Sequence, residues 1–271
     1  MESELTLMAV HAHPDDEVLS TGGIFAQYAE EGIRTVLVTC TNGEQGDAPG
    51  GIKPGQPGHD PAEVSRLRLA ELRESAAHLA IGHVELLGYP DSGMAGWDAN
   101  ADAAVFSNVP VERAAARLSE LMEKYRPQVV VTYDENGGYG HPDHIQAHRI
   151  AIAAAEATGI PRKLYETAVS RARIAEMMEY LRSTGADMGD FELPDDFGTP
   201  DEEITTVVDV SAYFERKRKA LEAHASQGDS IFLLRMPEEA QLRALGHEAF
   251  VRRLSTVTAP GQEDDLFAGL R

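Results

Sequence analysis

The feature that most constrains the fold of this chain is a set of short apolar runs rich in β-branched residues. They read ELTLMAV at residues 4–10, RTVLVTC at residues 34–40 and PQVVVTY at residues 127–133, and RKLYETAVS at residues 162–170 is a further candidate. Each run has the length of a strand, and the first three are apolar enough to be buried. We expect all four to form strands of the core.

Segments with helical spacing separate these runs, at residues 22–32, 61–81 and 110–126. Pro61 and Pro110 stand where the start of a helix tolerates proline. The order of strand, helix, strand and helix predicts an α/β fold, in which a mostly parallel sheet carries helices on both faces.

Two polar segments without periodicity interrupt this pattern. Residues 43–61 are crowded with glycine and proline, so we expect a long loop there, of a kind that is often functional. Residues 183–203 separate the sheet from a tail that alternates as a strand and then has helical spacing. Without an internal repeat or a clear linker, we expect one domain over residues 1–271, divided into a core at residues 1–170 and a C-terminal extension at residues 171–271.

Charge and cysteine content restrict the partners of the chain. With 24 basic and 45 acidic residues the formal charge is −21, so we expect no nucleic-acid partner and a neutral, sugar-like or cationic small molecule. Cys40 is the only cysteine, which excludes a disulfide framework and a thiolate zinc site. The sequence has no signal-peptide pattern and no apolar run of membrane-spanning length, so we expect a cytoplasmic protein without a membrane partner. The oligomeric state is left open.

A first group of polar residues, HAHPDDE at residues 11–17, falls where the first strand ends. Ligands of open α/β sheets bind beyond the carboxyl ends of the strands. So much acid beside histidines would be costly to bury without a partner, and a cation is an economical explanation. His13 and Asp16, three residues apart around a turn, can both reach one metal ion. The role of His11 stays open between packing beneath the site and supporting a ligand.

A second group, GGYGHPDHIQAH at residues 137–148, follows the third strand run. The two groups can converge if both loops lie at the same edge of the sheet. His13, Asp16 and His144 would then supply two imidazoles and a carboxylate, a ligand set of hydrolytic zinc with an open position for water. Asp15 would remain as a general base beside that water. A single HPD is common in turns and helix caps, but two of them at strand ends favour a metal site.

The same ligands can hold ferrous iron in an oxygenase, so Fe²⁺ is an alternative to Zn²⁺. The remaining polar groups favour hydrolysis, because Asp15, Tyr139, His141 and Asp143 suit proton transfer and oxyanion stabilisation better than oxygen activation. A metal-containing sugar-binding protein without turnover is an interpretation of another class. Such a protein would need none of these groups, and it would bind glycans without releasing acetate.

The motifs HPDDE at residues 13–17 and HPDH at residues 141–144 resemble those of the LmbE-like, or PIG-L, zinc-dependent N-deacetylases. The likeness extends from Leu5 to about Ala157, with weaker agreement at AHASQ, residues 223–227. HAHPDDEVLSTGG, DSGMAG and DENGGYGHPDH are most similar to the actinobacterial branch that handles mycothiol and its precursors. The resemblance implies a Rossmann-like fold, zinc-dependent amide hydrolysis, and a small-molecule glycoside or thiol conjugate as substrate.

Residue by residue, the resemblance implies that His13, Asp16 and His144 hold the metal and that Asp15 activates its water. The positions that match the sugar and inositol pocket are Ser20, Arg68, Asp91 and Met94.

The resemblance also implies roles for the second group. Tyr139 would polarise the acetyl carbonyl or steady the oxyanion. His141 would face the tetrahedral intermediate in its neutral or protonated form, oriented by Asp143.

Two related activities compete within this branch. Ser20, DSGMAG and YGHPDH favour the enzyme that removes acetate from N-acetylglucosaminyl-inositol, which we take as the expected function. YDENGGY and the short C-terminal region agree as well with the amidase that cleaves mycothiol S-conjugates, or with an unassigned paralogue. A deacetylase of antibiotic or other natural-product biosynthesis is a third alternative, since pocket loops vary more freely than a metal site.

Overall fold

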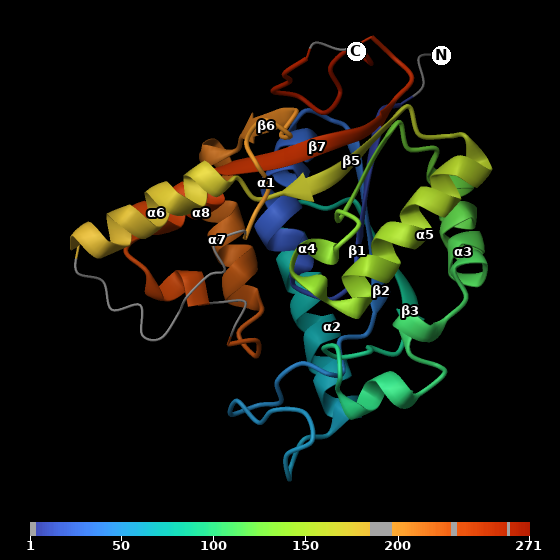
Figure 1. The fold of residues 1–271 in the computed structure, drawn as a ribbon, viewed down its shortest axis with the longest axis vertical. Helices are drawn as coiled ribbons and strands as arrows, with labels where there is room; N and C mark the ends of the chain where they lie inside the picture. Colours follow the sequence, from blue (N-terminus) through green and yellow to red (C-terminus); the bar gives the residue numbers. More distant parts are fainter. Residues whose placement is uncertain (1–3, 185–196, 229–231, 259–260) are drawn as a thin grey trace.

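The computed structural model describes residues 4–184, 197–228, 232–258 and 261–271. Within these residues, the centre is one seven-stranded sheet in the order β3-β2-β1-β4-β5-β7-β6. The strands are β1 (Thr6–His11), β2 (Arg34–Thr41), β3 (His83–Tyr89), β4 (Val129–Thr132), β5 (Lys163–Ala168), β6 (Thr206–Asp209) and β7 (His247–Ser255). The first five run parallel, and β7 pairs antiparallel with both β5 and β6 (Figure 1). The expected mostly parallel α/β sheet is confirmed.

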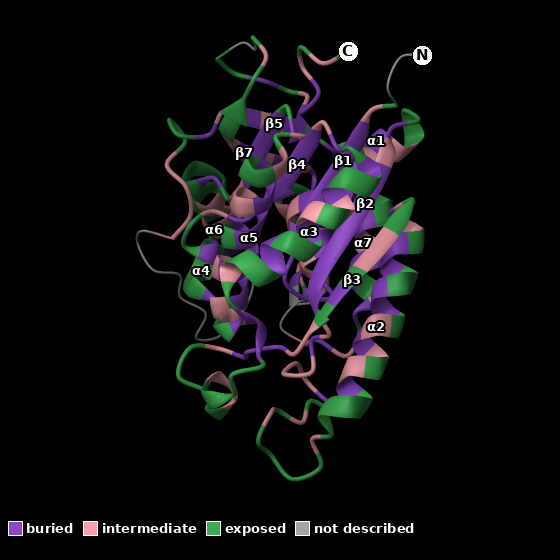
Figure 2. Ribbon diagram, turned by 90° about the vertical axis from the view of Figure 1, so that its right-hand side faces the viewer, coloured by how far each residue is buried: buried purple, intermediate pink, exposed green. Residues whose placement is uncertain are grey.

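Helices cover both faces of this sheet. The α-helices of the described residues are α1 (Asp16–Glu30), α2 (Pro61–His78), α3 (Val111–Tyr125), α4 (Gly137–Gly140), α5 (Pro142–Thr158), α6 (Arg171–Thr184), α7 (Phe214–Ala223) and α8 (Glu238–Leu245). Side chains alternate along a strand, so Leu7 and Ala9 of β1 pack with α1, α2 and α7, while Met8 and Val10 pack with α3 and α5. The buried central strands between these helices are visible in Figure 2.

The strand order reverses between β1 and β4. From β1 the chain continues outward to β2 and β3, and it then returns to place β4 on the other side of β1. Leu7 pairs with Val129 and Ala9 with Val131, so the two strands end close together. The crevice beyond the carboxyl ends of the strands at such a reversal is the usual ligand site of open α/β sheets.

Some elements were not expected from the sequence, and one helix begins earlier than expected. β3 is half-exposed at the edge of the sheet, and β7 mixes buried with exposed residues, so neither forms a continuous apolar run. α1 begins at Asp16 and not at residue 22. Gly22 and Gly23 are typical of a helix boundary, but both lie inside α1. Position 23 requires a glycine because a Cβ there would come within 2.4 Å of Val210.

The C-terminal part of the chain belongs to the same sheet. The tail strand and helix expected from the sequence are β6 and α7, and Lys163 of β5 forms a buried ion pair with Glu263 at 2.6 Å. A boundary at residue 170 therefore runs through a continuous sheet. Residues 43–60 form a loop with one isolated bridge, whereas most of the polar segment at 183–203 lies outside the described residues. In the described part of the chain, no helix has the length and apolar character needed to cross a bilayer.

Candidate metal centre

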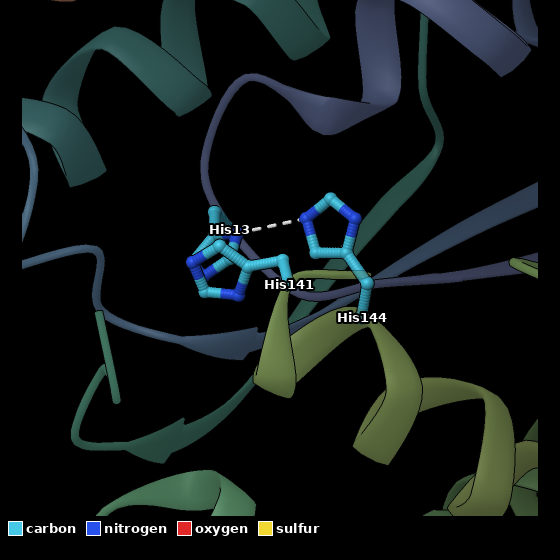
Figure 3. Close-up of side chains that lie close together, drawn as sticks. All are labelled: His13, His141 and His144. Atoms are coloured by element: carbon cyan, nitrogen blue, oxygen red, sulfur yellow. Dashed lines mark hydrogen bonds between the residues drawn. The ribbon is translucent and has the colours of Figure 1, made fainter. Parts of the chain in front are cut away.

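The loops that follow β1 and β4 meet at the carboxyl edge of the sheet. His13 lies in the loop after β1, and Asp16 is the first residue of α1. His144 lies in the first turn of α5. Although 131 residues separate them, His13 Nδ1 and His144 Nε2 are 3.2 Å apart (Figure 3).

Three side-chain atoms form a compact triangle at this point, which we call the donor triangle. His13 Nδ1 is 3.3 Å from Asp16 Oδ2, and His144 Nε2 is 3.5 Å from the same oxygen. The 3.2 Å between the two nitrogens is the third side. In a tetrahedral zinc site with bonds of about 2.0–2.1 Å, neighbouring ligand atoms are about 3.4 Å apart. The donor triangle therefore matches one face of such a tetrahedron and leaves the fourth corner for water or substrate.

Hydrogen bonds on the far side of each ring direct the nitrogen lone pairs. His13 Nε2 donates to Asp143 Oδ2 at 3.3 Å, and His144 Nδ1 donates to the Gly137 carbonyl at 3.2 Å. A neutral ring that donates through one nitrogen presents a lone pair at the other, so both rings point lone pairs into the donor triangle. Two lone pairs and a carboxylate oxygen this close together repel one another unless a cation or a proton lies between them.

Two other groups of possible ligand atoms lie within 4.8 Å of one another in the described residues, in His13, His141 and His144 and in His13, Asp91, His141 and Asp143. Both groups contain His13 and His141, and the second also contains the carboxylates Asp91 and Asp143. Asp143 accepts from Ser92 Oγ at 2.5 Å and from Ser92 N at 2.9 Å. Asp91 accepts from Gly93 N at 2.8 Å, and His141 Nδ1 accepts from Asp143 N at 3.1 Å.

The charges around the donor triangle attract positive charge. Burial opposes a proton on His13, but Asp91, Asp143 and Asp16 outweigh it and raise the pKa of His13 well above its usual value. Burial likewise opposes ionisation of Asp16, yet His144 and His13 hold the pKa of Asp16 well below its usual value. Burial lowers the pKa of His144 to about 4, so this ring is neutral at pH 7 and able to bind a metal.

Asp15, the predicted base, has a backbone φ of 122°. Non-glycine residues rarely adopt such a conformation, which stores about 1–3 kcal/mol of strain and is typical of functional sites. Arg68 Nη2 lies 3.2 Å from Asp15 Oδ2 and donates to the Pro14 carbonyl at 2.7 Å. Its Nη1 donates to the Gly43 carbonyl at 2.7 Å. The buried Arg68 therefore fixes the loop that carries Asp15.

His141 and Asp143 are arranged differently from the expectation. The Asp143 carboxylate lies against His13 and Ser92, and it is the Asp143 backbone N–H that orients His141 by donating to Nδ1. Since Nδ1 accepts this bond, a neutral His141 carries its proton on Nε2. Burial, together with His13 and His144, lowers the pKa of His141 to about 3, so the neutral form is present at pH 7 and the protonated form is not.

Tyr139 and Ser20 lie beside the donor triangle in the wall of one cleft. The cleft has a volume of about 1010 Å³, and Asp16 and His144 also line it. Tyr139 is 58% exposed, and its ring centroid lies 5.0 Å from that of His144. Its hydroxyl can therefore reach a molecule bound in the cleft.

The other predicted pocket residues lie apart from this wall. Arg68 and Asp91 are buried, and Asp91 Oδ1 is 3.6 Å from His13 Nε2 on the side away from the donor triangle. Met94 is half-buried in the loop after β3, and it is absent from the described residues that line the cleft.

Tyr133 is a part of the site that the sequence analysis missed. Its hydroxyl donates to Asp16 Oδ2 at 2.6 Å, and its ring stacks on that of His144 with 4.1 Å between centroids. Tyr133 ends the third apolar run, so the rule that ligands bind at strand ends could have identified it. His11, whose role was open, contacts Tyr133 Oη at 3.3 Å and Thr21 Oγ1 at 2.8 Å, behind the donor triangle.

Comparison with known proteins identifies the family of the chain. The profile of the PIG-L family, described as GlcNAc-PI de-N-acetylase, matches residues 8–155. The 1D-myo-inositol 2-acetamido-2-deoxy-alpha-D-glucopyranoside deacetylase of Acidothermus cellulolyticus is 42% identical over 282 residues, which cover 98% of this chain and 95% of that protein. The protein of the same name from Thermobifida fusca is 40% identical over 288 residues, with 97% and 98% covered.

Solved structures share the fold at lower identity. The N,N'-diacetylchitobiose deacetylase of Pyrococcus horikoshii has a TM-score of 0.56 at 19% identity, with 91% of this chain and 83% of that chain covered. GalB, the 4-carboxy-2-hydroxymuconate hydratase of Pseudomonas putida KT2440, has a TM-score of 0.61 at 19% identity, with 94% and 99% covered. Because proteins of different named activities share this fold, the fold alone does not fix the reaction.

Proposed function

Because the chain belongs to the PIG-L family, we propose that it is a metal-dependent hydrolase that removes the N-acetyl group from N-acetylglucosaminyl-inositol. The observation that carries the proposal is the donor triangle, whose sides measure 3.2, 3.3 and 3.5 Å. Relatives that span nearly the whole chain at 42% and 40% identity are named as deacetylases of that glycoside. Hydrolysis of an unactivated amide is a reaction for which such a centre is suited.

The residues of the donor triangle fit a divalent metal. Two imidazoles and a carboxylate are ligands of catalytic zinc, and ferrous iron accepts the same set. We propose His13, Asp16 and His144 as the ligands and zinc as the ion. When bound, zinc would lower the pKa of a water molecule toward neutrality and polarise the amide carbonyl. Asp143 and the Gly137 carbonyl hold the two imidazoles in the tautomers that this binding requires.

Three other side chains of the site act in the reaction: Asp15 transfers a proton, and His141 and Tyr139 donate hydrogen bonds. Asp15 takes the proton of the attacking water, whose oxygen forms a bond to the acetyl carbon. His141 Nε2–H and the Tyr139 hydroxyl donate hydrogen bonds to the oxyanion that develops from the carbonyl oxygen. The carbon–nitrogen bond then breaks, and Asp15 returns its proton to the amine nitrogen. The products are acetate and the free amine.

We propose that Ser20 contacts the sugar, because it lines the same cleft as Asp16 and His144. Arg68, Asp91 and Met94 lie apart from that wall, and we propose that they line the rest of the sugar and inositol pocket. One observation favours a second candidate, the amidase of mycothiol S-conjugates. The cleft volume of about 1010 Å³ is at the upper end of small-molecule sites, about 300–1,000 Å³, and would admit a larger substrate.

Acetate release from three compounds tests the proposal. They are N-acetylglucosaminyl-inositol, a mycothiol S-conjugate and N-acetylglucosamine, each assayed with the zinc-loaded protein and with Asp15→Asn as the control for contaminating activity. We expect the highest kcat/KM on the first compound. Faster cleavage of the conjugate would identify the amidase, and slow reaction of all three would indicate a natural-product substrate. Saturable glycan binding without acetate would identify a non-catalytic sugar-binding protein.

A further inference from the structure

The strained backbone of Asp15 is held by two hydrogen bonds, one made by its N–H and one by its carbonyl. The Asp15 N–H donates to Glu17 Oε2 at 3.0 Å, and the Asp15 carbonyl accepts from Val18 N at 3.1 Å. A non-glycine residue at φ 122° persists only where the surrounding structure determines it. The Glu17 side chain therefore contributes to the conformation of the residue proposed as the base.

Glu17 is itself fixed by residues that are distant in the sequence. Its Oε1 accepts from Ser75 Oγ of α2 at 2.5 Å and from His224 Nε2 at 2.8 Å. Glu17, Ser75 and His224 are all 0% exposed. A buried carboxylate is tolerated only when its oxygens are paired, and these oxygens receive three hydrogen bonds from Asp15, Ser75 and His224. These hydrogen bonds fix both oxygens of the Glu17 carboxylate.

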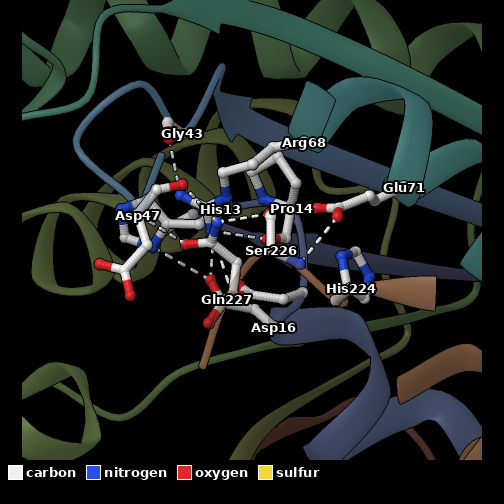
Figure 4. A network of polar contacts seen from close by, with 12 residues as sticks. His13, Pro14, Asp16, Gly43, Asp47, Arg68, Glu71, His224, Ser226 and Gln227 are labelled. Atoms are coloured by element: carbon white, nitrogen blue, oxygen red, sulfur yellow. Dashed lines mark hydrogen bonds and ion pairs between the residues drawn. The ribbon is translucent and has the colours of Figure 1, made fainter. Parts of the chain in front are cut away.

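The segment that carries His224 is held against two other elements (Figure 4). Ser226 donates to Glu71 of α2 through its N–H at 2.9 Å and its hydroxyl at 2.7 Å. Gln227 bonds to both peptide groups of Asp47, at 3.1 and 3.2 Å. Residues 223–227 therefore link α2, the loop after β2 and the start of α1. This is the AHASQ segment, to which the mechanism above assigns no role.

We propose that Glu17 is a positioning residue for the hydrolysis, which fixes the backbone of Asp15 and so the direction of its carboxylate, with Ser75 and His224 as supports. The inference rests on the proposed function, in which Asp15 takes the proton of the attacking water. Glu17 does not touch the substrate. Its position matters for rate because a displacement of about 1 Å in a catalytic group can cost about a hundredfold.

A role in stability alone leads to a different expectation. If Glu17 only stabilised the junction of α1, α2 and α7, its replacement would lower the melting temperature without changing turnover of the folded, metal-loaded protein. Any loss of turnover caused by replacing Glu17 would also have the same size in the wild-type protein and in an Asp15 variant. A double-mutant cycle with Asp15 separates the two roles.

The experiment compares wild type, Glu17→Gln, Asp15→Asn and the double variant, all loaded with zinc and assayed for acetate release well below their melting temperatures. A glutamine has one acceptor oxygen and loses the negative charge of Glu17, so the three hydrogen bonds to Asp15, Ser75 and His224 persist only if the Ser75 hydroxyl rotates and His224 gives up its Nε2 proton. We expect kcat of Glu17→Gln to fall about 10- to 100-fold, as for other residues that orient a catalytic group. KM and bound zinc should stay within about twofold, and the double variant should be about as slow as Asp15→Asn.

The smaller change Ser75→Ala keeps the inference testable if Glu17→Gln fails to fold, and we expect it to lower kcat about three- to tenfold in the same cycle. Lys163→Met is the matched control, because it breaks a buried ion pair of 2.6 Å with Glu263 at the start of β5, whereas Asp15 follows the end of the parallel strand β1. It should lower the melting temperature and leave kcat unchanged.

Two results would overturn the inference while leaving the proposed function intact: unchanged kcat in Glu17→Gln or Ser75→Ala, or the same fold-loss with and without the Asp15→Asn change. Wild-type turnover of zinc-loaded Asp15→Asn would instead overturn the assignment of the base, and the inference with it.

Discussion

Asp143 offers a quantitative test of how the donor triangle is assembled. Its Oδ2 accepts from His13 Nε2 at 3.3 Å and from Ser92 N at 2.9 Å, while Oδ1 accepts from Ser92 Oγ at 2.5 Å. Binding of a metal at His13 Nδ1 requires the proton on Nε2, and Asp143 stabilises that tautomer. In Asp143→Ala the metal-free ring can take the other tautomer and donate from Nδ1 to Asp16 Oδ2, which lies 3.3 Å away. Metal binding must then reverse this change and leave a buried N–H without its acceptor.

We therefore expect Asp143→Ala to weaken zinc binding about 10- to 100-fold, which corresponds to about 1.4–2.7 kcal/mol. Asp143→Asn should weaken it only a few fold, because the amide oxygen can still accept from His13 and Ser92 N while Ser92 Oγ rotates to accept from the new NH₂. Competition against a chromogenic chelator at pH 7 measures both dissociation constants. Unchanged zinc affinity in Asp143→Ala, or equal losses in the two variants, would refute the assignment of Asp143 to the orientation of His13.

Three further predictions concern the oxyanion, the core and pH. Tyr139→Phe should lower kcat about a hundredfold with KM nearly unchanged, as expected for a donor to the oxyanion; an unchanged kcat in steady-state assays would exclude that role. Gly23→Ala should destabilise the fold by about 1–3 kcal/mol in denaturant melts, since its Cβ would lie 2.4 Å from Val210, and a stable variant would contradict this packing. Burial opposes ionisation of Glu263, but Lys163 and other neighbours lower its pKa, so its contribution to stability is present above about pH 4.5 and is lost as pH falls through the lowered value. Melts of wild type and Glu263→Gln should therefore differ most at pH 7 and converge toward pH 3, and a constant difference would contradict the lowered pKa.

The parts of the fold that could be predicted from the sequence are those whose residues lie in one uniform environment. β1, β2 and β4 are buried on both faces, so their residues form continuous apolar runs. β3 lies at an edge, and β7 pairs antiparallel with two neighbours that are distant in the chain. Their residues lie in mixed surroundings that arise only when the sheet has assembled, so no continuous apolar run marks these strands in the sequence.

The same limit applies to the site. The convergence of His13 and His144 follows from strand ends that neighbour each other in a parallel sheet. The partner of the Asp143 carboxylate depends on ring and side-chain orientations, which spacing does not specify. The contact between Glu17 and His224 joins residues 207 apart in the sequence, and it forms only because α7 packs against α1 and α2.

In the proposed mechanism, the donor triangle holds the one metal ion that the hydrolysis of N-acetylglucosaminyl-inositol requires. The most direct measurement is the initial rate of acetate release as zinc is titrated into chelator-treated protein. We expect a rate that rises linearly and reaches its plateau at one zinc per chain, and a His144→Ala variant that shows neither the rise nor the plateau. Full acetate release before zinc is added, or zinc bound at one per chain without acetate release, would contradict it.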